Sequence, residues 1–189
     1  EFQYHPRKKY VRDYFEVLFQ IAETKKALSD EDGAIDTYNR IRKESKDKPL
    51  KISQQVHEYS VPGYKNRADF EIGLLYFKWG NMEAAKEKLK EAMEWASEEA
   101  KESWLTRTWR DENQKDLQFL EAQSSLPLGR IAILEKDYFG NEGAFSYINR
   151  VISLEKSGNE KGFMNLGHQA LILAMQACLL SSLNPDGSV

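Results

Sequence analysis

Apolar residues recur at steps of three and four along nearly the whole chain, which is the period of an α-helix. The longest stripe begins at Met82 and continues through Trp104 toward Trp109, which predicts a helix of about 28 residues, or about 42 Å. We find no run of alternating β-branched residues bounded by hairpin turns, the pattern of a strand pair. The sequence therefore predicts an all-α protein.

Turn residues divide this pattern into separate helices. Ser29–Gly33, Gly80-Asn81 and Gly140-Asn141 combine helix-terminating and helix-capping residues. The polar residues at 111–113 indicate a further break, and Pro127 is expected to kink its helix or to start a new one. The expected helices lie around residues 14–25, 34–42, 52–59, 66–79 and 82–109, on either side of Gly140, and at 163–183.

A short motif recurs in the second helix of each predicted pair. The segment 33–41 (GAIDTYNRI) matches the segment 143–151 (GAFSYINRV), and the segment 84–92 (AAKEKLKEA) is a weaker version. The alignment places Ala34, Ala85 and Ala144 at the same position. A small residue there allows the helix to approach its pair-mate closely, and the bulky residue four positions later fills the gap.

These helix pairs resemble the tetratricopeptide repeat (TPR), whose pattern is W-x2-L-G-x2-Y…A-x3-F…P. Residues 66–99 match best, with Ile72-Gly73, Tyr76, Ala85 and Leu89, whereas Asp69 stands in place of the family tryptophan. Residues 15–48 and 122–157 match less well, and the repeats are spaced further apart than the family period of about 34 residues. The resemblance implies one domain over residues 1–189, a TPR-like α-solenoid of antiparallel helical hairpins with irregular spacing and an extra C-terminal helix.

Family members usually bind ligands in the groove lined by the first helix of each pair, so the resemblance implies a peptide or helix of another protein as the ligand. The helix at 66–79 is apolar on two arcs and must be covered twice. One cover is the neighbouring helices, and the other is either the partner or the insert at residues 50–60 folding back. The residues predicted to contact the partner are Arg67, Phe70, Leu74, Phe77, Lys78, Trp109, Arg130 and His168.

In the first pair the groove positions are Glu16, Phe19, Glu23 and Lys26. Some family members hold a partner's terminal carboxylate with a cluster of Lys and Asn on this face. The matching positions here are mostly apolar or acidic, so the sequence argues against such a carboxylate clamp.

The last helix, 163–183, has little polar surface, although repeat arrays normally end in a helix with a polar outer face. Three explanations remain open: a further partner surface, a homo-oligomer through this helix, or a longer chain whose next repeat follows. The chain has no run of 18 apolar residues, so we expect no membrane-spanning helix.

Composition and residue spacing argue against several kinds of binding site and against a reactive cysteine. The net charge is -3, from 27 Lys and Arg against 30 Asp and Glu, so we expect no general attraction to nucleic acid or anionic membranes. His5, His57 and His168 lack metal-ligand spacing, and no glycine-rich phosphate loop is present, so we predict no metal and no cofactor. Cys178 lies in an apolar stretch, where a buried thiol is inert.

The sequence as a whole favours a non-catalytic scaffold or adaptor that binds another protein. The alternative is a structural subunit of a larger assembly, held by the C-terminal helix and the long central helix. An enzyme would need two titratable groups in contact within a cleft, and no motif proposes such a pair. The cytoplasm is the favoured compartment, and periplasmic or other extracytoplasmic locations are also compatible with one cysteine.

Overall fold

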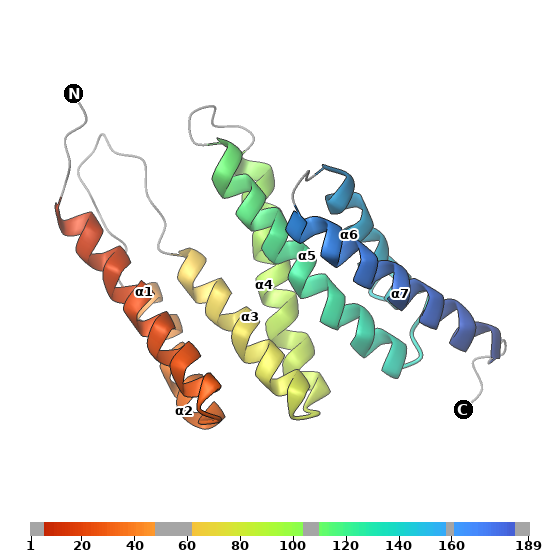
Figure 1. The fold of residues 1–189 in the computed structure, drawn as a ribbon, viewed down its shortest axis with the longest axis horizontal. Coiled ribbons are helices and arrows are strands. Elements are labelled where there is room, and N and C mark those ends of the chain that lie inside the picture. Colours follow the sequence, from red (N-terminus) through yellow and green to blue (C-terminus); the bar gives the residue numbers. More distant parts are fainter. Residues whose placement is uncertain (1–5, 48–61, 104–109, 158–160, 184–189) are drawn as a thin grey trace. The chain divides into compact units, whose positions relative to one another are not determined.

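A computed structural model describes residues 6–47, 62–103, 110–157 and 161–183, and within them the chain forms seven helices and no strand (Figure 1). The helices are α1 (Pro6–Ala27), α2 (Glu31–Asp47), α3 (Pro62–Lys78), α4 (Met82–Ser103), α5 (Arg110–Leu134), α6 (Ala144–Ser157) and α7 (Lys161–Leu183). The predicted all-α class is confirmed.

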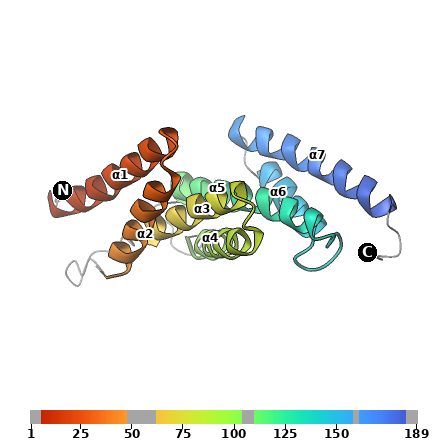
Figure 2. The same cartoon turned by 90° about the horizontal axis from the view of Figure 1, so that it is seen from below.

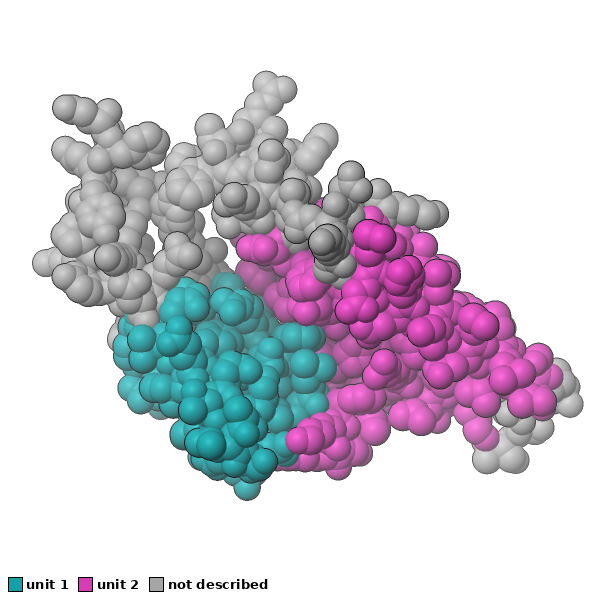
Figure 3. Space-filling view, viewed as in Figure 1, with its two compact units in different colours: residues 1–75 teal, residues 76–189 magenta. Residues whose placement is uncertain are grey.

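The chain divides into two compact units, Glu1–Leu75 and Tyr76–Val189, and the boundary falls inside α3 (Figure 3). In the first unit α1 packs against α2. In the second unit α5 packs against both α4 and α6, and α7 packs against α5 and α6 (Figure 1, Figure 2). Packing of helices that follow one another in the chain is the architecture of a TPR-like array of helical hairpins. The single domain over residues 1–189 stays a prediction.

Two of the predicted turns have the expected capping chemistry. The Asp30 carboxylate accepts a hydrogen bond from the Gly33 N–H at 3.0 Å, which caps the start of α2. Gly80 has a φ of 77° and ends α3, because a residue without a Cβ adopts this left-handed conformation at little cost. The Asn81 side chain then accepts a hydrogen bond from the Ala84 N–H at the start of α4.

One expectation about α5 is wrong, and one of the two alternatives for Pro127 is excluded. Residues 111–113 are not a break, because α5 begins at Arg110 and runs through them. Polar residues that include carboxylates are favoured near a helix N-terminus, where they complement the helix dipole. Pro127 does not start a new helix, since α5 continues through it to Leu134. The expected helix at 52–59 and the extension of α4 to Trp109 lie outside the described residues.

The three aligned alanines, Ala34, Ala85 and Ala144, are all fully buried, as the repeat motif predicts. The contact between α5 and α6 is close at this point. A Cβ built on Gly129 would lie 3.6 Å from the Tyr147 Cβ and 3.8 Å from the Ala144 carbonyl oxygen. Small residues therefore stand where these two helices approach each other.

Candidate functional site

Charged side chains of α1 and α3 form a network on the surface of the first unit. We call it the Arg67 face and define it by Glu16, Glu23 and Lys26 of α1 with Arg67 and Glu71 of α3. The Arg67 Nη1 lies 3.6 Å from the Glu16 Oε1. These α1 residues are groove positions predicted from the sequence, and the helices bring them to Arg67.

Lysine and tyrosine side chains hold the carboxylates of this face in place. The Lys26 Nζ lies 2.8 Å from the Glu23 Oε1 and 2.7 Å from the Glu71 Oε2, so it joins α1 to α3. The Tyr38 hydroxyl donates a hydrogen bond to the Glu23 carboxylate, and the Tyr64 hydroxyl donates one to Glu16 at 3.0 Å. Each carboxylate of the Arg67 face is therefore already paired in the protein.

The Arg67 guanidinium also stacks over an aromatic ring. Its Cζ lies 4.7 Å from the centroid of the Phe19 ring, within the range of a cation–π interaction. The Phe19 side chain is itself buried, so the guanidinium covers an apolar part of the first unit's core. Arg67 is thus fixed from two sides, by the ring and by Glu16.

The two carboxylates that share Lys26 have opposite pKa shifts. Burial raises the pKa of Glu71 above its usual value, although the hydrogen bond from Lys26 opposes this. Burial also acts to raise the pKa of Glu23, but hydrogen bonds from Lys26 and Tyr38 outweigh it and the pKa is lowered. Burial and the hydrogen bond to Glu23 raise the pKa of the Tyr38 hydroxyl, so it stays protonated as a donor. This chemistry suits recognition of charge.

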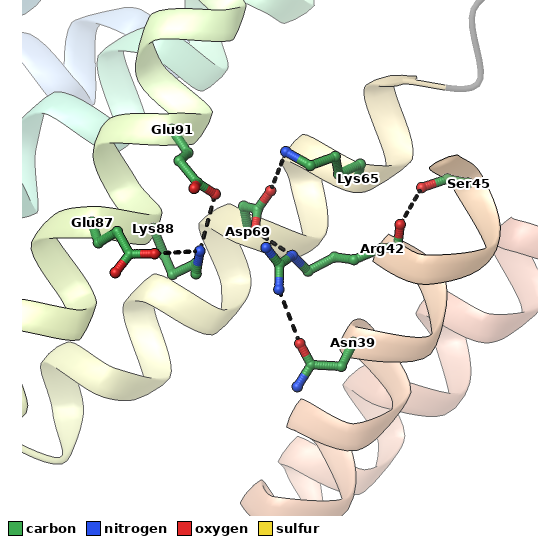
Figure 4. A network of polar contacts seen from close by, with 8 residues as sticks. All are labelled: Asn39, Arg42, Ser45, Lys65, Asp69, Glu87, Lys88 and Glu91. Atoms are coloured by element: carbon green, nitrogen blue, oxygen red, sulfur yellow. Dashed lines mark hydrogen bonds and ion pairs between the residues drawn. The ribbon is translucent and has the colours of Figure 1, made fainter. Parts of the chain in front are cut away.

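A second polar cluster of the first unit joins α2 to α3 (Figure 4). Asp69 is fully buried, with its Oδ1 2.5 Å from the Arg42 Nε and its Oδ2 3.1 Å from the Lys65 Nζ. Arg42 also donates to the Asn39 side chain at 3.2 Å. The position that holds tryptophan in the family motif therefore holds a buried ion pair here. The sequence marked Asp69 as unusual and gave no sign of its partners.

The second unit has a polar depression of about 320 Å³ lined by α4, α6 and the segment before α6. Tyr147 is only 4% exposed, its hydroxyl has no hydrogen-bond partner among the described residues, and burial raises its pKa to about 12. Lys90 pairs with Glu142 and Arg150 pairs with Glu121. Sequence reasoning missed this depression, because it is lined by the second helices of two different hairpins, outside the predicted groove.

The tetratricopeptide repeat family model matches residues 70–99, which cover the second half of α3, the turn at Gly80 and most of α4. The match supports a TPR-like repeat in this part of the chain. It agrees with the stretch 66–99 in which the sequence motif is strongest. No curated protein and no solved structure matches the chain. Protein binding is the general role of the TPR.

The predicted partner-binding residues of the TPR-like array have different surroundings. Arg67 is 52% exposed, whereas Phe70, predicted as an apolar anchor, is 8% exposed and belongs to the core. Leu74 and Phe77 are half-buried. Lys78, Arg130 and His168 are exposed, and Trp109 lies outside the described residues, as do residues 50–60. Burial leaves Phe70 little surface to offer a partner, and its predicted contact, like the other seven, stays a prediction.

Within residues 6–47, 62–103, 110–157 and 161–183, no group of three or more His, Cys, Asp or Glu residues is placed to hold a metal ion. The stretch Met164–Leu183 of α7, with mean hydropathy 1.4, is long and apolar enough to cross a membrane by length and composition. The sequence still has no run of 18 apolar residues, because polar residues such as His168 and Gln176 interrupt this stretch. The absence of a membrane span stays a prediction.

Proposed function

We propose that the chain is a non-catalytic adaptor whose Arg67 face binds a peptide or helix of another protein. The TPR at residues 70–99 is the observation that carries this proposal, because protein binding is the general role of that repeat. The Arg67 face includes Glu16, Glu23 and Lys26, which the sequence predicts to line the groove of the first hairpin, and it presents a network of fixed charges. Side chains held in advance by ion pairs and a stacked ring lose little entropy when a ligand docks.

The charges of the Arg67 face favour a partner segment that carries lysine or arginine. Glu16, Glu23 and Glu71 supply three carboxylates against the two cations of Lys26 and Arg67. Both cations are already paired, so an acidic ligand would have to displace a carboxylate of the protein. A basic side chain can join the exposed edges of Glu16 and Glu23 without breaking a pair. Complementary charge of this kind selects the partner and speeds encounter.

Apolar contact would come from α3. Leu74 is half-buried and lies three residues after Glu71, on the same side of the helix. The ligand of this proposal is therefore an amphipathic segment with basic residues beside an apolar stripe, the mode in which a helix binds in a groove.

The test compares two fluorescein-labelled amphipathic peptides that are identical except that their charged residues are all lysine or all glutamate. Fluorescence polarisation should detect tighter binding of the lysine peptide to the full chain. Glu16→Lys should weaken this binding at least tenfold, since it makes the face net positive. Asp36→Lys is the matched control, because it makes the same charge change at an exposed position of α2 and should leave binding unchanged.

Circular dichroism must show the same helix content for both variants and for the unsubstituted chain. Equal binding of the two peptides, or equal loss in the Asp36→Lys control, would contradict the proposal at this face. A preference for the glutamate peptide would show that Lys26 and Arg67 dominate recognition, and it would also contradict the proposal.

A further inference from the structure

The last helix, α7, has one covered side and one open side. Leu166, Ala170, Leu173 and Ala177 are buried, at the spacing of one helix face, where α7 packs against α5 and α6. The opposite side is apolar and exposed. We call it the α7 face; its members are between 52% and 72% exposed, namely Met164, Leu171, Ile172, Met175, Leu179 and Leu183.

The α7 face is an apolar patch that runs along one side of a helix. Each of its six residues is more than half exposed. Monomeric proteins rarely expose large contiguous apolar patches, and such patches mark surfaces that contact another molecule.

The residue spacing on this face matches a helix–helix seam. Ile172, Met175 and Leu179 of this face, with the polar residues His168 and Ser182 before and after them, follow one another at alternating steps of four and three residues, the spacing of a coiled coil. Each of them is exposed, so the seam is open along its length. A second helix with the same spacing could pack its side chains between these residues.

The α7 face carries no fixed charge. Between Gly162 and Leu183 the sequence has no Asp, Glu, Lys or Arg. Two copies of this face can therefore meet without placing like charges together. A strongly charged partner would find no complementary group, so charge favours a neutral apolar occupant.

We propose that the α7 face is a two-fold interface at which a second copy of this chain docks, α7 against α7. Two identical apolar faces that carry no Asp, Glu, Lys or Arg are self-complementary, which is what an isologous dimer requires. Such a contact covers both exposed faces at once and leaves no open end. The Arg67 face belongs to the first unit and is not part of this interface.

A bilayer-spanning position of α7 fits the structure less well. The buried side of α7 contacts α5 and α6 over residues 166–177. Inserting α7 across a bilayer would strip this side from α5 and α6. A second copy covers the exposed side and leaves the packing of the buried side intact.

Sedimentation equilibrium of the full chain over a range of concentrations tests the proposal. The unsubstituted chain should form a dimer, and the double variant Ile172→Glu/Leu179→Glu should raise the dissociation constant at least a hundredfold. The effect should be large because each two-fold contact receives every substitution twice. Both positions are exposed, so helix content measured by circular dichroism should not change.

The matched control is the double variant Val17→Glu/Ile21→Glu on α1, where two apolar side chains are also exposed on one helix face. It should dimerise as the unsubstituted chain does. A monomer at all concentrations would overturn the proposal, as would a dimer that the α7 variant leaves intact. Equal dissociation by the α1 variant would indicate an α1–α7 contact and overturn it too. A monomer that co-sediments with phosphatidylcholine vesicles would assign the face to a lipid surface instead.

Discussion

At the scale of single residues, Lys26 holds two carboxylates whose stability effects have opposite signs. Glu23 gains from its ion pair and hydrogen bonds more than it loses by burial, so its pKa falls. Glu71 loses more by burial than the same lysine returns, so its pKa rises. The free-energy cost of removing a carboxylate from water is larger for Glu71 than for Glu23, because Glu71 is more deeply buried. A desolvation cost that exceeds the gain from an ion pair is common for buried pairs.

The buried carboxylate predicts a pH-dependent cost to stability. A raised pKa means that the folded chain keeps the Glu71 proton at pH values where the unfolded chain has lost it. Stability therefore falls as pH rises from the usual value of 4.5 through the folded pKa, and the cost is absent below 4.5. Glu71→Gln, which cannot ionise, should gain stability relative to the unsubstituted chain between pH 4 and pH 7. Urea unfolding followed by circular dichroism at both pH values measures the difference.

Asp36→Asn controls for the loss of one negative charge, since this carboxylate is exposed on α2. If Glu71→Gln loses stability relative to the unsubstituted chain as pH rises, the ion pair with Lys26 outweighs burial and the interpretation of Glu71 is wrong.

The sequence predicted part of this residue-level picture. It placed Glu16, Glu23 and Lys26 on a groove face and singled out Arg67, because helical spacing alone fixes which residues share a face. It did not predict the ion pairs, since Glu71 and Lys26 are far apart in sequence and meet only when α3 packs beside α1. It predicted Phe70 as a partner contact and could not show that this side chain is buried, because an apolar residue has the same appearance in a sequence whether it is buried or exposed.

At the scale of elements, the turn between α5 and α6 depends on one glycine. The Gly143 N–H donates to the Gly140 carbonyl at 2.8 Å, and the Ala144 N–H donates to the Asp137 carbonyl at 2.8 Å. A Cβ on Gly143 would lie 2.6 Å from the Gly140 backbone nitrogen and 2.9 Å from the Tyr138 carbonyl carbon. Those are backbone atoms, which cannot move aside without opening the turn.

Gly143→Ala should therefore destabilise the chain by about 1–3 kcal/mol, the usual cost of overpacking. Gly129→Ala is the matched control. Its Cβ would meet only ordinary contacts at 3.6–3.8 Å, and alanine is the better helix former inside α5. Urea midpoints of the two variants should move in opposite directions. An unchanged midpoint for Gly143→Ala would mean that the turn is looser than these contacts indicate.

Helical periodicity predicted the elements themselves, including α7, because each helix buries one apolar stripe and ends at turn residues. The errors came from α5. Its polar first turn at 111–113 has the composition of a loop, and its interior Pro127 has the chemistry of a breaker. Tertiary packing overrode both local signals: most of the residues between 120 and 132 are buried, so the contacts along this stretch favour a continuous helix.

At the scale of the whole molecule, the sequence showed a repeating architecture and could not show where the chain divides. The boundary after Leu75 falls inside α3, where the helix continues without interruption. Such a division depends on the number of contacts each segment makes in three dimensions, which no local pattern contains. In repeat arrays each hairpin contacts only its neighbours, so stability need not be uniform along the chain.

This architecture predicts that loss of the buried ion pair in the first unit lowers the stability of that unit alone. Asp69→Ala would leave Arg42 and Lys65 without the carboxylate that joins α2 to α3, at a cost of about 2–4 kcal/mol, because both cations still reach solvent. Amides of α1 and α2 should then exchange hydrogen about thirtyfold to a thousandfold faster. Amides of α5, α6 and α7 should keep their exchange rates, because those helices pack against one another in the second unit. Hydrogen exchange with mass spectrometry measures both sets in one experiment, with Asp36→Ala as the exposed control. An equal increase of the exchange rates in both units would show that the chain unfolds as one cooperative body and would contradict the prediction.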